Sequence, residues 1–237
     1  MSHMLKGENL GLLVCRQWNV IGSEIYDTVF ITKYITDLNL FRRGGATLFP
    51  LYLYAPHGKQ PNFTTEFRKY IKNLYGKEPA PEEILYYIYA ILYSPTYREK
   101  YKEQLKYNFP RIPFAEDYQK FKRLSEFGKK LVKLHLLEDE SLNFPSVKFK
   151  GKGTNEVEKV SYKNGKVYIN KNQYFEPVSE EIWNYKIGGY QVLKKWLSYR
   201  KGRKLTLEEI ETFMKTVKAL EETIKLQEKI DMETDFV

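Results

Sequence analysis

The stretch YFEPVSEEIWNYKIGGYQVLKKWLSYRKGRK, residues 174–204, decides how the fold is interpreted. Two adjacent glycines, Gly188 and Gly189, predict a turn, although they are equally compatible with a role in capping and packing the helix that follows. That helix is short and amphipathic, and its apolar face is formed by Leu193, Trp196 and Leu197. Between positions 186 and 204 the chain has seven Lys or Arg and no Asp or Glu. Such a run of positive charge is suited to binding a polyanion.

A long helix is predicted downstream of this basic stretch. Thr206 and Glu209 have the spacing of a capping box, and apolar residues continue at helical spacing as far as Ile224. From Leu205 onward there are nine acidic residues and four lysines, so this part of the chain is net negative. We therefore expect the helix to support the fold, or to dock another part of a larger enzyme, rather than to lie along DNA.

Upstream of the stretch, the segment VEKVSYKNGKVYIN (157–170) predicts a β-hairpin. Asn-Gly is the preferred pair for a two-residue turn, and it would pair Tyr162 with Val167 and Val160 with Ile169. The polar loop GKGTNE (151–156) precedes the hairpin and contains Asn155. This loop is interpreted either as a plain connector or as a loop that probes a DNA groove.

The first half of the chain divides into a β-rich part and a helical part. Residues 10–55 are rich in β-branched and aromatic residues and predict strands, whereas residues 81–137 have helical periodicity. Between two of the strands lies FRRGGA (41–46), with Arg42, Arg43, Gly44 and Gly45. One interpretation is a hairpin loop with solvated charges. The other is a loop whose glycines let the backbone approach DNA while an arginine reaches a phosphate or a guanine edge.

The predicted fold class is α+β, with mixed or antiparallel β elements at both ends, a helical middle and a long C-terminal helix. Residues 1–4, MSHM, are interpreted as a remnant of cloning, and the abrupt start in strand-like sequence predicts a C-terminal piece of a longer protein. A boundary near residue 140 would separate 5–140 from 141–237. We nevertheless expect one continuous domain, because the β segments on both sides can share a sheet.

Composition limits the classes of partner. The net charge of +9 and the pI of about 9.2 fit a nucleic-acid-binding protein, and they also fit an ordinary basic protein. A single cysteine, Cys15, excludes an internal disulfide and a Cys-rich zinc site, and its apolar neighbours predict a buried thiol. No apolar run has membrane-spanning length and no signal peptide is visible, which predicts a cytoplasmic protein without a membrane partner.

Motifs for catalysis are missing from the sequence. A methyltransferase acting on adenine needs a Gly-rich loop for S-adenosylmethionine and an Asp/Asn/Ser-Pro-Pro-aromatic motif, and neither occurs. No Asp or Glu has Lys two residues later, as common magnesium nucleases require, and no phosphate-binding GxxxxGK[ST] motif is present. His57 is expected at the surface and His135 in the core or at a helix end. We therefore expect no catalytic residue, metal or cofactor in this chain.

Six segments together resemble one protein family. In chain order these are GENLGLLVCRQ (7–17), FITKYITDLNLFRRGGATLFPLYLY (30–54), PNFT (61–64), YIYAILYSPTYREKYKEQLKYNFPRIP (87–113), GKKLVKLHLLE (128–138) and IWNYKIGGYQVLKKWLSYRKGRKLTLEEI (182–210). The chain resembles the C-terminal target-recognition domain of type ISP restriction–modification enzymes and related adenine-specific DNA methyltransferases. The resemblance implies binding to double-stranded DNA. It also implies an upstream methyltransferase domain, which would use S-adenosylmethionine to methylate adenine, and possible helicase-like and nuclease domains.

Candidate DNA contacts follow from charge and this resemblance together. The stronger candidates are Arg42, Arg43, Lys194, Lys195, Arg200 and Arg203, with Gly44 and Gly45 allowing a close approach. The weaker candidates are Arg16, Gln17, Lys33, Asn155 and Gln191. A different interpretation is a protein-docking module of a larger nucleic-acid enzyme. RNA binding is less favoured, because no RNP-type aromatic motif or GXXG loop is present.

Overall fold

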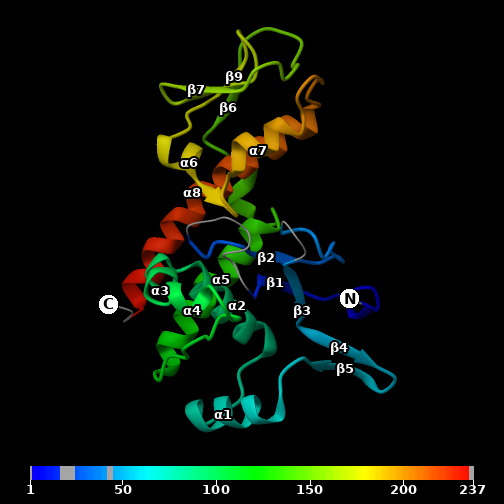
Figure 1. Cartoon of the computed structure of the whole chain (residues 1–237), viewed down its shortest axis with the longest axis vertical. Coiled ribbons are helices and arrows are strands. Elements are labelled where there is room, and N and C mark those ends of the chain that lie inside the picture. Colours follow the sequence, from blue (N-terminus) through cyan, green and yellow to red (C-terminus); the bar gives the residue numbers. More distant parts are fainter. Residues whose placement is uncertain (1, 17–24, 42–44, 235–237) are drawn as a thin grey trace. The chain divides into compact units, whose positions relative to one another are not determined.

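The computed structural model describes residues 2–16, 25–41 and 45–234 (Figure 1). The chain forms two compact units. Unit 1 comprises Met1–Leu136 and Leu226–Val237, and unit 2 comprises Leu137–Lys225. Each unit contains helices and antiparallel strands, so the predicted α+β class is confirmed.

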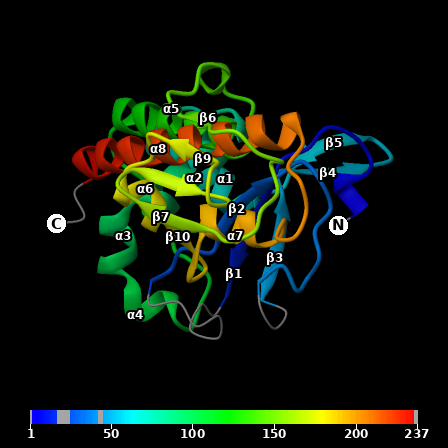
Figure 2. The same cartoon turned by 90° about the horizontal axis from the view of Figure 1, so that it is seen from above.

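Unit 1 is built on a three-stranded antiparallel sheet in which β1 (Gly11–Cys15) lies between β2 (Val29–Thr32) and β3 (Ala46–Pro50), as Figure 2 shows. Every residue of β1 is buried, which explains why this strand is apolar throughout instead of alternating. A second, two-stranded sheet pairs β4 (Tyr52–Ala55) with β5 (Gly58–Pro61). The strands predicted in residues 10–55 are therefore present.

Two helices, α2 (Pro81–Tyr93) and α5 (Tyr118–His135), pack against each other in unit 1. Their backbones approach closely at Gly128, where a Cβ atom would lie 1.8 Å from the carbonyl oxygen of Tyr86. Glycine is required at this position because no side chain fits between the helices. Unit 1 also contains shorter helices: η1 (Ser2–Met4), α1 (Thr65–Tyr75), α3 (Pro95–Lys100) and α4 (Lys102–Leu105).

Unit 1 is completed by the end of α8 (Leu207–Glu233). Ile230 is fully buried, and the Gln227 side-chain amide donates to the Tyr93 carbonyl over 2.9 Å. The Asp231 carboxylate accepts hydrogen bonds from the Ser94 hydroxyl and from the Thr96 backbone N–H. A segment more than a hundred residues distant in sequence thus closes the end of α2.

Unit 2 contains a four-stranded antiparallel sheet in the order β6-β9-β8-β7, visible at the top of Figure 1. Its apolar face packs on helices, and the ring centroids of Phe175 in the sheet and Phe213 in α8 are 4.2 Å apart. The core is closed by Leu193 and Leu197. Besides α8 up to Lys225, the elements of unit 2 are η3 (Glu140–Asn143), β6 (Lys148–Lys150), β7 (Ser161–Lys163), β8 (Lys166–Tyr168), β9 (Tyr174–Glu176), α6 (Glu180–Asn184), β10 (Lys186–Ile187), β11 (Tyr190–Gln191) and α7 (Val192–Ser198).

The predicted hairpin is confirmed, and Tyr162 lies opposite Val167. The strand ladder ends one pair later, with Ser161 opposite Tyr168, so the predicted pair of Val160 with Ile169 is not part of it. The reason is local, because the Ile169 carbonyl accepts from the backbone N–H groups of Glu158 and Lys159 instead.

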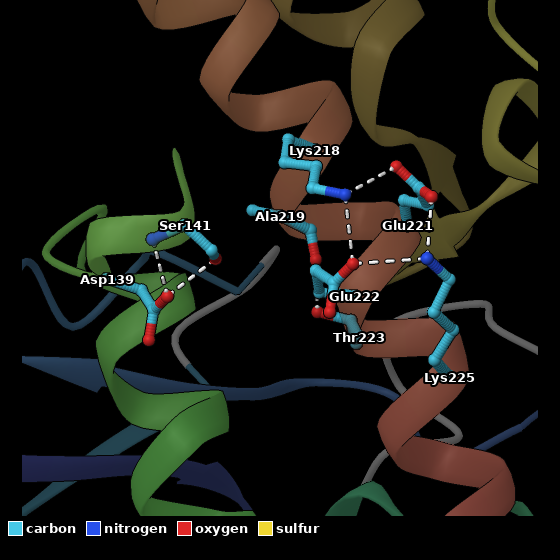
Figure 3. A network of polar contacts seen from close by, with 8 residues as sticks. All are labelled: Asp139, Ser141, Lys218, Ala219, Glu221, Glu222, Thr223 and Lys225. Carbon is cyan, nitrogen blue, oxygen red and sulfur yellow. Dashed lines mark hydrogen bonds and ion pairs between the residues drawn. The ribbon is translucent and has the colours of Figure 1, made fainter. Parts of the chain in front are cut away.

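Both predicted capping contacts are present at the start of α8. The Glu209 N–H donates to Thr206 Oγ1 and the Thr206 N–H donates to Glu209 Oε2, each over 3.2 Å. Further along the helix its acidic side chains pair with its own lysines (Figure 3). Lys218 bonds Glu221 and Glu222 at 3.1 and 3.0 Å, and Lys225 contacts the same two carboxylates. The negative charges of Glu221 and Glu222 are therefore compensated within the helix.

Candidate nucleic-acid interface

A basic groove lies on unit 2 beside α7. Its volume is about 500 Å³, and no acidic residue is among the eight described residues that line it. Those residues are Asn184, Lys186, Gly189, Tyr190, Gln191, Lys194, Lys195 and Ser198. We call this surface the α7 groove. Three ammonium groups without a carboxylate among them form a site with the charge that phosphate oxygens require.

The β10–β11 hairpin sets one wall of the α7 groove. Lys186 pairs with Gln191 and Ile187 with Tyr190, and Gly188 and Gly189 form the two-residue turn between them. The φ angles of these glycines are 60° and 79°, a left-handed conformation that residues with a side chain adopt only at an energetic cost. The glycine pair is thus required by the turn.

Helix α7 sets the other wall. Leu193 and Leu197 are fully buried in the core of unit 2, and Trp196 packs beside them, so the predicted apolar face is confirmed. Burying the two leucines stabilises the helix position by roughly 2 kcal/mol each. Because that face is fixed inward, Lys194 is left exposed on the groove side.

Two tyrosines flank Lys195, of which Tyr190 also lines the groove. The Lys195 ammonium lies 4.2 Å from the ring centroid of Tyr190 and 5.0 Å from that of Tyr199. Tyr190 is 48% exposed and Tyr199 is 73% exposed, so both rings reach solvent. Neither tyrosine is a candidate from charge, although the spacing of four residues between Lys195 and Tyr199 in a helix is a signal for such a contact.

Gln191, one of the weaker predicted DNA contacts, lines the groove, and its amide is already engaged. Its Nε2 donates to Asn184 Oδ1 over 2.9 Å and to the Trp183 carbonyl over 3.4 Å. The side chain therefore ties the hairpin to the end of α6. It also keeps Asn184 at the edge of the groove.

Arg200 and Arg203 share one carboxylate, that of Glu209. Arg203 contacts it through two nitrogens, at 2.6 and 3.0 Å, and Arg200 Nε contacts it at 3.0 Å. The Arg200 guanidinium also stacks on the Trp196 ring, 3.4 Å from its centroid. Hydrogen bonds from Arg203 foremost, and from Thr206 and Arg200, hold the pKa of Glu209 at about 2. The structure therefore gives both arginines a role within the fold, in addition to the predicted contact with DNA.

Asn155 has a φ of 63° and belongs to a hydrogen-bonded loop. Its N–H donates to Gln173 Oε1 over 2.8 Å, and its Oδ1 accepts from Gln173 Nε2 over 2.7 Å. The side chain of Asn155 is thus used within unit 2, and its contact with DNA stays a prediction.

The candidates of unit 1 lie at two ends of its sheet. Arg16 directly follows β1 and Gly45 directly precedes β3, and the neighbouring residues Cys15 and Ala46 are paired. Lys33 follows Thr32, which pairs with Gly11 at the opposite end of β1. Gln17, Arg42, Arg43 and Gly44 lie outside the residues that the structure describes.

The described residues contain no cluster of three or more His, Cys, Asp or Glu that would hold a metal ion. His135 lies at the end of α5, where burial lowers its pKa to about 3 and its Nδ1 is 2.7 Å from the Tyr89 hydroxyl. His57 is exposed. Both histidines therefore lie as the sequence predicts. No helix among the described residues is long and apolar enough to cross a bilayer.

Comparisons with known proteins point to one family. The family model of the type ISP C-terminal specificity domain matches residues 1–229. The ATP-dependent type ISP restriction–modification enzyme LlaBIII bound to DNA is 18% identical, with a TM-score of 0.74. The cryo-EM structure of a DrdV–DNA complex is 21% identical, with a TM-score of 0.74. A nuclease-deletion mutant of the type ISP enzyme LlaGI, in complex with a DNA substrate mimic, is 19% identical, with a TM-score of 0.66.

The alignments cover 95%, 94% and 94% of this chain, respectively. They cover only 16%, 24% and 18% of the three structural neighbours. The chain thus spans at most a quarter of their length, and at these identities the likeness establishes the fold alone. No curated protein matches the sequence.

Proposed function

Since the chain belongs to the type ISP C-terminal specificity domain family, we propose that it binds double-stranded DNA and selects the site on which a longer restriction–modification enzyme acts. The observation that carries this proposal is the α7 groove, which three lysines line without a carboxylate. The three structural neighbours, each solved with DNA or a DNA mimic, support it.

In this proposal the ammonium groups of Lys186, Lys194 and Lys195 contact phosphates. Such contacts fix the position of a protein on the duplex but carry little sequence information themselves. Tyr190 and Tyr199 hold Lys195 at the groove surface, which reduces the conformational entropy lost on binding. Arg42 and Arg43 remain predicted contacts of unit 1.

We further propose that the chemistry lies elsewhere in the parent polypeptide. An upstream methyltransferase domain would bind S-adenosylmethionine and methylate adenine in the cytoplasm, while this chain supplies neither catalytic residues nor a cofactor. The missing methyltransferase motifs and the short share of the neighbours' length support this division. Incubating the chain with duplex DNA and labelled S-adenosylmethionine tests it, and transfer of label to DNA would contradict it.

The DNA proposal is tested by duplex affinity as a function of salt concentration. We expect K194Q/K195Q to weaken binding and to lower the slope of log K against log salt by about two, one for each lost phosphate contact. The matched control is K129Q/K130Q, which also removes two adjacent lysines from a helix, one exposed and one half-buried, in unit 1. Equal slopes for the wild type and K194Q/K195Q would refute a role for the α7 groove in DNA binding.

A second candidate function is docking against the rest of a longer polypeptide. Four apolar side chains between β2 and β3 are exposed: Tyr34, Ile35, Leu38 and Leu40 are 77%, 51%, 56% and 51% exposed. A cluster of exposed apolar residues is typical of a protein contact. Binding through this segment would depend weakly on salt, which separates it from DNA binding.

A further inference from the structure

Three loops of unit 2 are joined into one surface, and the third of them directly follows α7. They are residues 151–156, 170–173 and 200–204, which we call the loop edge. The first and third loops pair through the backbone: the N–H groups of Val157 and Leu205 donate to the carbonyls of Arg203 and Asn155 over 3.1 and 2.9 Å. The Gly202 N–H returns a bond of 2.8 Å to the Val157 carbonyl.

The second loop is attached to the first by Gln173, which is 2% exposed. Its side chain accepts from the Asn155 N–H and donates to Asn155 Oδ1. Its Oε1 also accepts from Asn170 Nδ2 over 3.1 Å, and that same nitrogen donates to the Glu156 carbonyl over 3.0 Å. A buried amide with its hydrogen bonds satisfied fixes the first and second loops relative to each other.

Two glycines let the first and second loops touch. A Cβ at Gly151, whose φ is 96°, would lie 2.0 Å from the Asn172 carbonyl oxygen. A Cβ at Gly153 would lie 2.5 Å from Gln173 Oε1. The contact is therefore too close for any other residue, and the loop edge is a preorganised surface.

Groups on this surface point to a nucleic acid. The three loops contain six Lys or Arg and one acidic residue, Glu156. Arg200 and Arg203 are paired with Glu209, whereas the other four cations are exposed and make no ion pair with the described residues. Those four are Lys152, Lys171, Lys201 and Lys204.

Asn172 differs from the other amides of the loop edge. Its backbone N–H is held by Asn170 Oδ1 over 3.0 Å, and its carbonyl packs on Gly151. Its side chain, in contrast, is exposed and makes no hydrogen bond within the described residues. An amide presented in this way offers the donor and acceptor pair that matches N7 and N6 of adenine in the major groove.

We propose that the loop edge is a second DNA contact, in which Asn172 reads a base edge and Lys152, Lys171, Lys201 and Lys204 bind the flanking phosphates. This inference rests on the proposed function and adds the determinant of sequence preference to it. Phosphate contacts at the α7 groove would supply affinity, while the rigid loops place one amide for discrimination.

The test begins with selection of a preferred site by the wild-type chain from a random-sequence duplex library. Affinity is then measured for that site and for each single base-pair change. We expect N172A to lose roughly tenfold or more of the discrimination at one base pair, while its affinity for unrelated duplex stays unchanged. Alanine fits there because Asn172 is not among the positive-φ residues. N73A on the exposed side of α1 is the matched control.

A second variant, K171Q/K201Q/K204Q, measures the phosphate contacts separately. We expect its salt slope to fall by about one for each lysine that binds a phosphate, with the base preference retained. The inference would be overturned if N172A discriminates between base pairs as well as the wild type does and the salt slope of K171Q/K201Q/K204Q is unchanged. That result would leave the proposed function intact. A wild-type chain that binds duplex without enriching any sequence would overturn base reading by Asn172. Absence of any duplex binding by the wild type would overturn both proposals.

Discussion

Replacing Glu209 separates its two roles, as the partner of two arginines and as part of a helix cap. In E209Q the amide still accepts from the Thr206 N–H, because glutamine also completes a capping box. The charge that binds Arg200 and Arg203 is lost. In E209A both the cap contact and the ion pairs are lost.

The expected free energies follow from these contacts. Exposed ion pairs contribute about 0.2–1 kcal/mol each, and this carboxylate bonds two guanidinium groups, so E209Q should destabilise unit 2 by about 1 kcal/mol. E209A should cost about 2 kcal/mol, since one capping bond is lost as well. The control E208Q removes an exposed carboxylate from the same first helical turn. The loss in free energy of unfolding in E208Q reports the helix-dipole effect alone. The further loss in E209Q is then the contribution of the ion pairs with Arg200 and Arg203.

Urea unfolding followed by tryptophan fluorescence measures these values, because Trp183 and Trp196, two of the three tryptophans, belong to unit 2. The pH dependence gives an independent check. The pKa of folded Glu209 is lowered from 4.5 to about 2, so its contribution is present above pH 4.5 and is lost as the pH falls towards 2. Wild type should therefore lose more stability than E209Q over that interval. Equal stabilities of E209Q and E208Q, with parallel pH profiles, would refute the reasoning.

Three further substitutions test the packing of each unit. G128A should destabilise unit 1 by about 2–3 kcal/mol, although alanine favours helices, because the Cβ would collide with the Tyr86 carbonyl; calorimetry against K129A checks this. L197A should cost unit 2 about 2–5 kcal/mol in urea unfolding, since the side chain is fully buried; an unchanged midpoint would contradict the assigned core. G189A should weaken the β10–β11 hairpin by about 1 kcal/mol and lower duplex affinity, and unaltered binding would separate the hairpin from the interface.

Local signals in the sequence predicted the local structure. The Asn164–Gly165 turn, the Thr206–Glu209 cap and the apolar face of α7 each depend on residues within a few positions of one another. The strands of unit 1 were predicted in the same way, from their composition. Patterns of this kind are visible because the physical interaction and the sequence spacing coincide.

The contacts between distant segments were not predictable. Arg200 and Arg203 looked like free cations in a basic run, and only the chain path from α7 into α8 brings Glu209 to them. Asn155 was placed in a possible groove-probing loop, but its partner Gln173 is eighteen residues away. Arg16 and Lys33 lie at opposite ends of the sheet because β1 and β2 are antiparallel, and the pairing register of the strands could not be derived from the sequence.

The last turns of α8 make unit 1 discontinuous in sequence, and this has a consequence for synthesis on the ribosome. The bonds from Gln227 to Tyr93 and from Asp231 to Ser94 and Thr96 cannot form until the end of α8 has been translated. The nascent sheet and helices of unit 1 must wait, incompletely packed, while the whole of unit 2 emerges and acquires its own core. A premature stop codon just after Lys225 would thus leave unit 2 with all its residues, whereas unit 1, although synthesised first, would lack its closing segment.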